Sequence, residues 1–123
     1  MKHSQHEQLP AGLLVKRFVD IAVRQYEADL GSDVSMYNKL YKQMEALVEE
    51  LKLRPGDQRR ALMPIYSHPN NHARMKAAVN TLAIDYLAAR QVLEDVAASG
   101  QYPTAGRAGM TLDALDRGIF KPA

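Results

Sequence analysis

Apolar residues recur every three or four positions along most of this chain, and this helical period restricts its fold more than any other feature. The two longest periodic stretches cover about residues 10–29 and 34–53, with charged residues on the opposite side of each. Between them, Gly31 is a helix stop and Ser32 or Asp33 is a candidate N-cap. A three-residue connection between two long amphipathic helices predicts an antiparallel helical hairpin over residues 10–53.

Residues 57–83 predict a shorter pair of helices. Asp57 is a candidate cap for the first helix, and Pro64 should kink that helix because proline lacks an amide hydrogen. A turn at residues 67–71 leads into a second helix, which we expect to end near residue 83. Asp85 then caps a fifth helix within residues 85–99. Because no segment alternates apolar and polar residues for long, we expect an all-α fold.

Residues 100–123 differ from the rest because glycine and proline interrupt them repeatedly, and we expect no long helix there. One short helical turn, over residues 112–117, is the exception. A free tail would expose its apolar residues, so we predict an irregular tail that docks onto the helices. The expected anchors are Met110, Leu112, Leu115, Ile119 and Phe120. At the other end, residues 1–9 are expected to be flexible.

Length and composition exclude several classes of protein. A chain of 123 residues fits a single domain, and the absence of cysteine excludes disulfides, cysteine-ligated zinc, iron–sulfur clusters and thiol nucleophiles. No apolar run approaches the roughly 20 residues of a membrane span, and the first residues lack the apolar core of a signal peptide. We therefore expect a cytoplasmic protein with no membrane partner.

The charges are evenly spread, with 16 Lys and Arg against 14 Asp and Glu. A protein that binds phosphate backbones usually clusters its cations, so nucleic-acid binding is not favoured. Residues 57–76 are the local exception, because four cations face a single acid, Asp57. These cations are Arg59, Arg60, Arg74 and Lys76.

We predict no catalytic, cofactor or metal site. His68 and His72 have the four-residue spacing of helical zinc ligands, but Pro69 lies between them and no third ligand is near. His3 and His6 are better explained by a solvated chain end. Glu45 and Glu49 belong to an ordinary charged helix face.

A possible partner-binding face lies on the fourth helix, where His72, Lys76 and Asn80 align at four-residue spacing. Arg59 and Arg60 are candidates to extend this face, and an ordinary solvated face is the alternative. Arg74 is expected to tie helices together by pairing with Asp57 or Asp85. The apolar stripe of the second helix is expected to form core rather than to line a pocket; it comprises Tyr37, Leu40, Tyr41, Met44, Leu47, Val48 and Leu51.

Residues 59–78 resemble a HEAT-type repeat: a helix interrupted by proline, a His-Pro-Asn turn, then an arginine and paired alanines opening a second helix. Small residues at positions 73, 77 and 78 favour close helix packing independently of the resemblance. One good copy of the motif is visible, so a solenoid and an ordinary bundle both remain open.

Over nearly all of residues 14–122, the chain also resembles a bacterial family catalogued as domain of unknown function 2019. The most specific segments are residues 56–62, residues 68–70 and the ending from Ala108 to Pro122. The resemblance implies a HEAT/armadillo-like right-handed stack of about five helices. It implies no activity, no cofactor and no catalytic residue.

The expected function is therefore a non-enzymatic protein–protein interaction module, either an adaptor or an immunity-type protein that blocks a partner. Two alternatives remain open. One is binding of a nucleic-acid backbone through the basic face, and the other is a small-molecule or enzyme site made of dispersed residues.

Overall fold

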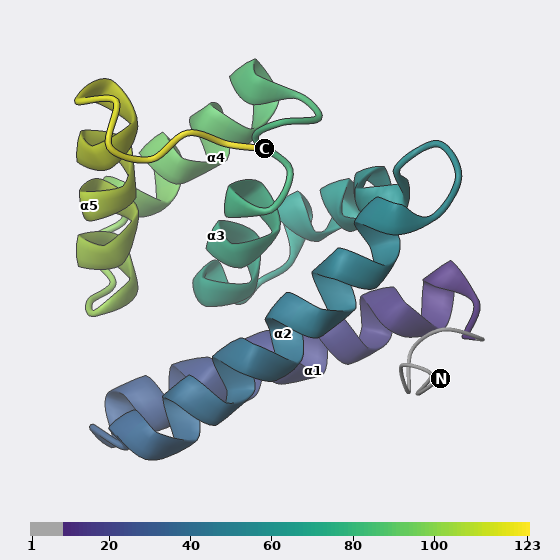
Figure 1. The fold of residues 1–123 in the computed structure, drawn as a ribbon. Coiled ribbons are helices and arrows are strands. Elements are labelled where there is room, and N and C mark those ends of the chain that lie inside the picture. Colours follow the sequence, from purple (N-terminus) through teal and green to yellow (C-terminus); the bar gives the residue numbers. More distant parts are fainter. Residues whose placement is uncertain (1–8) are drawn as a thin grey trace. The chain divides into compact units, whose positions relative to one another are not determined.

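The structure is a computed structural model that describes residues 9–123. These residues form five α-helices and one 3₁₀-helix, with no strand among them, which confirms the all-α prediction (Figure 1). The expected flexible start at residues 1–9 falls outside the described residues, apart from Leu9. The chain divides into two compact units, one ending at Ala61 and the other running from Leu62 to Ala123. Within residues 9–123, no helix has both the length and the apolar character needed to span a membrane.

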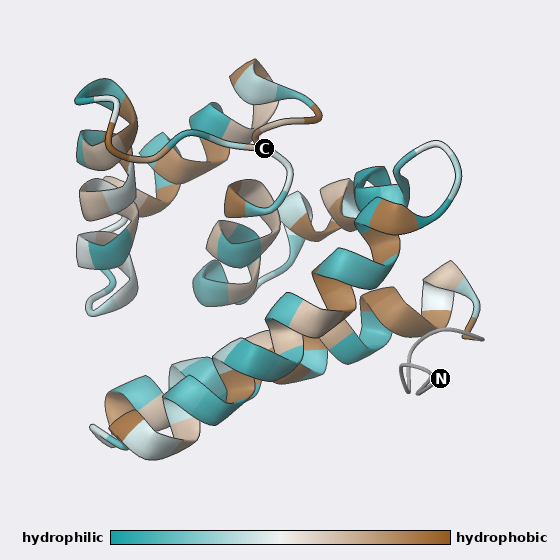
Figure 2. Cartoon of the chain, in the orientation of Figure 1, coloured by the Kyte–Doolittle hydropathy of each residue, from teal (hydrophilic) through white to brown (hydrophobic). Residues whose placement is uncertain are grey.

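The first unit is built on an antiparallel hairpin of α1, Ala11–Leu30, and α2, Val34–Leu53 (Figure 1). Figure 2 shows hydrophilic residues (teal) and hydrophobic residues (brown) alternating along the ribbon of α2, as expected for an amphipathic helix. Apolar residues from both helices form the core between them. These residues are Leu14, Phe18, Ile21, Ala22, Ala28, Tyr37, Leu40, Met44, Leu47 and Leu51. Tyr41, by contrast, is 48% exposed and lies outside that core.

The hairpin turn differs in one detail from the expectation. Asp33 is the N-cap of α2, because its Oδ1 accepts a hydrogen bond of 3.0 Å from the Met36 backbone amide. The left-handed residue of the turn is Ser32, with φ of 55°, whereas Gly31 has φ of −87°. The open end of the hairpin is tied by Arg54, whose Nη2 donates to the Leu9 carbonyl at 2.6 Å.

The segment Gln58–Ser67, labelled η1, is a 3₁₀-helix rather than the kinked α-helix that we expected. It contains Pro64, which cannot donate the backbone hydrogen bond that an α-helix requires at that position. The turn before it has two consecutive left-handed residues, Gly56 and Asp57, with φ of 80° and 52°. Asp57 Oδ1 accepts a hydrogen bond from the Arg59 amide at 3.3 Å, so Asp57 starts η1 as predicted.

The second unit contains α3, Asn71–Val79, α4, Tyr86–Ala97, and α5, Thr104–Asp116. Helix α3 packs on α4, α4 packs on α5, and α3 touches α5. Asn70 and Asp85 cap α3 and α4 by accepting hydrogen bonds from the backbone amides three residues on. The core of this unit comprises Met75, Ala78, Leu82, Ala89, Val92, Leu93, Val96 and Ala108.

Helix α5 shows that the prediction of an irregular tail was wrong. Pro103 directly precedes the helix, where its missing amide hydrogen costs nothing, and Gly106 and Gly109 lie inside it. Burial of Thr104, Ala105 and Ala108 offsets the low helix propensity of the glycines. The docking itself is partly as expected. Leu112, Leu115 and Phe120 pack against the core, whereas Met110 and Ile119 are 73% and 67% exposed and are not anchors.

Candidate interaction surface

The predicted partner-binding face on α3 does not form a row of exposed side chains. His72 is fully buried, so it presents no surface to a partner, and its assignment to an exposed face was wrong. Lys76 and Asn80 are half-buried, and the Asn80 side chain donates to the Lys76 carbonyl at 2.8 Å. Helix α3 is short and buried on several sides, which the four-residue spacing alone did not indicate.

Arg59 is also withdrawn from the surface, with a side chain only 9% exposed. It holds Asp57 in a two-point ion pair, in which Nε donates to Oδ1 at 2.9 Å and Nη2 donates to Oδ2 at 2.6 Å. These hydrogen bonds lower the pKa of Asp57 from its usual value, and the same pairing raises the pKa of Arg59. Arg60 is exposed, so it is the one of the two arginines that a partner could reach.

Arg74 does not pair with Asp57 or Asp85, contrary to the prediction. Its Nε donates to the Tyr66 carbonyl at 2.7 Å and its Nη1 donates to Asn71 Oδ1 at 3.0 Å. It thus satisfies a carbonyl near the end of η1 that the helix itself leaves open. Arg59 and Arg74 of the basic segment therefore bind acceptors of the chain itself.

The candidate metal ligands do not assemble. His68 Nδ1 accepts a hydrogen bond from the Asn70 amide at 2.9 Å, so this side chain shapes the turn. Within residues 9–123 there is no group of three or more side chains suited to hold a metal ion. His3 and His6 lie outside the described residues. Glu45 and Glu49 are exposed on the outer side of α2.

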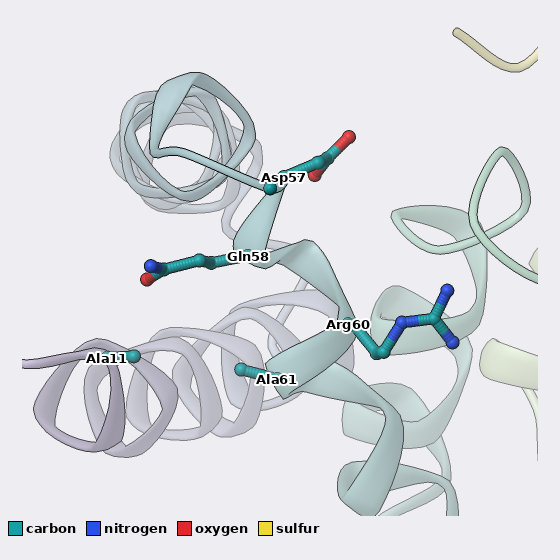
Figure 3. A pocket seen from close by; sticks show the side chains of 6 residues that line it. Ala11, Asp57, Gln58, Arg60 and Ala61 are labelled. Carbon is teal, nitrogen blue, oxygen red and sulfur yellow. The ribbon is translucent and has the colours of Figure 1, made fainter.

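An open depression of about 510 Å³ lies in the first unit, where the start of α1 meets the start of η1. Its lining includes Ala11, Asp57, Gln58, Arg60 and Ala61. Figure 3 shows that the Asp57, Gln58 and Arg60 side chains point in different directions. The depression thus lacks the convergent polar groups of a typical small-molecule site.

The most distinctive exposed surface lies on the outer side of α5, and we call it the α5 face. It comprises Tyr102, Gly106, Met110, Asp113 and Arg117. Spacings of four, three and four residues place Gly106, Met110, Asp113 and Arg117 on one side, opposite the side that carries Ala105 and Ala108. Tyr102 precedes the helix and joins this side because its ring lies over Gly106. Tyr102 and Met110 are 69% and 73% exposed, although both are large apolar residues.

The two glycines of α5 differ in their surroundings. A Cβ atom on Gly106 would meet only the Tyr102 ring, at 3.5 and 3.6 Å, so the ring lies over this glycine. A Cβ atom on Gly109 would meet nothing within 4 Å. The packing of the second unit therefore does not require a glycine at position 109.

An ion pair at the surface joins α5 to α4. Arg90 of α4 binds Asp116 of α5 at 2.8 Å and also contacts Glu94 and the Tyr86 hydroxyl. These contacts raise the pKa of Arg90, with the hydrogen bond to Asp116 as the largest cause. Because Ala108, Leu112 and Leu115 pack in or against the core, the outer side of α5 is a preformed surface rather than a loose tail.

Comparison with known proteins places the chain in a family. Residues 13–116 match the family described as a domain of unknown function (DUF2019). The chain belongs to this family. Its fold is similar to the crystal structure of the protein RPA1889 from Rhodopseudomonas palustris, with a TM-score of 0.92 and 43% sequence identity over 99% of this chain and 100% of that chain. No curated protein matches the sequence.

The sequence does not predict the α5 face, because glycine and proline both have low helix propensity. The apolar and small residues of the segment nevertheless recur with a helical period, which was the available signal. They are Thr104, Ala105, Ala108, Leu112 and Leu115.

Proposed function

We propose that this DUF2019 protein is a non-enzymatic protein–protein interaction module, of adaptor or immunity type, and that the α5 face contacts its partner. The observation that carries the proposal is the exposure of Met110 on α5, at 73%, and of Tyr102 directly before this helix, at 69%. Tyrosine and methionine are enriched where proteins bind one another, because they bury a large apolar area.

A neighbouring glycine supports the same proposal. Gly109 has no side chain and no atom within 4 Å of its Cβ position, so a partner backbone could approach α5 there more closely than it could an alanine surface. Each glycine disfavours the helix by about 1 kcal/mol relative to alanine, and the packing of the second unit gives no reason for Gly109. Close approach by another chain would explain both the exposed residues and the bare backbone.

The proposal treats the helices as a HEAT/armadillo-like right-handed stack. Support comes from the order of packing in the second unit, where α3 packs on α4 and α4 on α5. The turn after η1 and the Arg74 contact with the Tyr66 carbonyl further link the two halves of the repeat-like motif. In such stacks each repeat contacts only its neighbours, so the last helix has no further repeat beyond it.

Affinity purification from a lysate of the native host, followed by mass spectrometry, tests the proposal. Wild-type protein should recover a specific partner, and Met110→Glu should lose it because a charge would enter the apolar centre of the α5 face. Leu87→Glu is the matched control, since Leu87 is 81% exposed on the outer side of α4. This control should recover the same partner as the wild type.

Binding of the purified partner should then be measured by calorimetry at low and high salt. We expect Met110→Glu to weaken binding at least tenfold, with little dependence of the wild-type affinity on salt. Recovery of no specific protein, or equal binding by Met110→Glu and wild type, would overturn the proposal. Recovery of nucleic acid with steeply salt-dependent affinity would favour the basic segment instead.

A further inference from the structure

Helix α1 carries a second apolar stripe, separate from the one that packs into the hairpin. We call it the α1 outer stripe, and it comprises Val15, Val19, Val23, Tyr26 and Leu30. Spacings of three and four residues align these positions along the full length of the helix. Leu30 is 57% exposed and the other four are partly exposed, whereas the packed side of α1 is buried.

Four exposed charges run beside this stripe and alternate in sign. In chain order they are Lys16, Asp20, Arg24 and Glu27. From Lys16 to Glu27 the signs are positive, negative, positive, negative, and in the reverse direction each sign is the opposite. A row with this property is complementary to itself when two copies lie antiparallel, and repulsive when they lie parallel.

From this pattern we infer that α1 associates with α1 of a second copy of the chain, antiparallel and about a two-fold axis near Val23. In that arrangement Val15 lies opposite Leu30 of the second copy, and Val19 lies opposite Tyr26 of the second copy. The charges fall into the same register, because Lys16 then faces Glu27 of the second copy and Asp20 faces its Arg24. The midpoint of each of these four residue pairs lies between positions 21 and 23. A single antiparallel arrangement therefore forms the apolar contacts and the ion pairs together.

The length of α1 sets the expected strength of the dimer. Its 20 residues extend about 30 Å. A single helix-to-helix contact of this length buries on the order of 1,000 Å², which is at the lower limit of specific interfaces. A symmetric contact forms each residue pair twice, as two-fold interfaces do. We therefore expect a reversible dimer with a dissociation constant in the micromolar range.

Sedimentation equilibrium of the full chain between about 5 and 500 µM tests the inference, with charge-reversal variants as probes. Lys16→Glu should weaken dimerisation about tenfold, because it creates two repulsive contacts with Glu27. The double variant Lys16→Glu with Glu27→Lys restores opposite signs and should recover the wild-type constant within about twofold. These side chains are exposed, so circular dichroism should be unchanged.

Disulfide trapping gives an independent measurement, because the natural chain has no cysteine. Val23→Cys places one thiol from each copy near the two-fold axis and should yield a covalent dimer on mild oxidation. Leu13→Cys is the control, since Leu13 is 48% exposed on α1 but lies outside the stripe. A protein that stays monomeric at 500 µM would overturn the inference. So would an unchanged constant for Lys16→Glu, failure of the double variant to restore it, or equal trapping at both positions.

Discussion

The ion pair between Asp57 and Arg59 should contribute about 1.5 kcal/mol of coupling free energy to folding. Arg59 donates two hydrogen bonds to the Asp57 carboxylate, with lengths of 2.9 and 2.6 Å. The Arg59 side chain is only 9% exposed. We propose to remove the pair with Arg59→Gln and Asp57→Asn, separately and together. Asparagine tolerates the left-handed backbone at position 57 and still accepts from the Arg59 amide.

The magnitude follows from the exposure of the two groups. Opposite unit charges about 4 Å apart attract by about 4 kcal/mol at an effective dielectric constant of 20. Desolvating Arg59 offsets much of this attraction, and water reaches Asp57, whose side chain is 31% exposed. Exposed pairs typically contribute below about 1 kcal/mol and loss of one partner of a buried pair costs about 3 to 5. The present pair lies between these cases, and 1.5 kcal/mol corresponds to about a tenfold change in the folding equilibrium.

The coupling should also depend on pH in a defined direction. The pKa of Asp57 is lower in the folded protein than in the unfolded chain, where it is about 3.9. Such a group contributes its full stability above the unfolded pKa, and loses that contribution as the pH falls through the folded pKa. The coupling should therefore be constant from about pH 5 to 8, and should shrink below about pH 4.

Urea unfolding of the four proteins, followed by circular dichroism, measures the coupling as a double-mutant cycle. The cycle should be run at pH 7 and again at pH 3. A coupling below about 0.3 kcal/mol at pH 7 would refute the reasoning, because it would give the pair the value of an ordinary surface contact. An equal coupling at pH 3 and pH 7 would refute the assignment to a charged Asp57.

Three substitutions test the backbone and the core. Ser32→Gly should raise the unfolding free energy by about 0.5 kcal/mol, because relief of the left-handed strain at φ of 55° exceeds the added entropy of glycine in the unfolded chain; a lower melting temperature would contradict this. Gly109→Ala should raise that free energy by up to about 1 kcal/mol, because the new methyl group meets no atom within 4 Å. A loss of stability in urea would show that the glycine is required by the fold. Leu93→Ala, at a fully buried position of the second unit, should cost about 3 kcal/mol in urea unfolding. A cost below 1 kcal/mol would mean that the core collapses into the space.

Local features of the fold could be predicted because they depend on neighbours within one or two helical turns. The side chains of Asp33, Asn70 and Asp85 cap the helices that follow them, as their positions before periodic stretches indicate. The length of the α1–α2 hairpin likewise follows from its two stripes and its short turn. In each case, the residues that make the structure are close together in the sequence.

The candidate site could not be predicted in the same way, because burial depends on residues that are distant in the chain. His72 shares its four-residue spacing with half-buried Lys76, yet packing around α3 buries His72 completely. Arg59 and Arg60 are adjacent and chemically identical, but Arg59 pairs with the Asp57 carboxylate and is buried, whereas Arg60 is exposed. A helical period identifies one side of a helix, and it does not show how many other sides the fold covers.

Helix α5 shows where the demands of folding and of binding separate. Its two glycines together disfavour the helix by about 2 kcal/mol relative to alanine, and Pro103 before it provides no side-chain cap. The helix forms because its inner side is buried against the core. That inner side would be equally well buried with alanine at position 109, where a methyl group meets no atom. The cost of this glycine is therefore not explained by packing within the second unit, and a partner that approaches the α5 face closely would account for it.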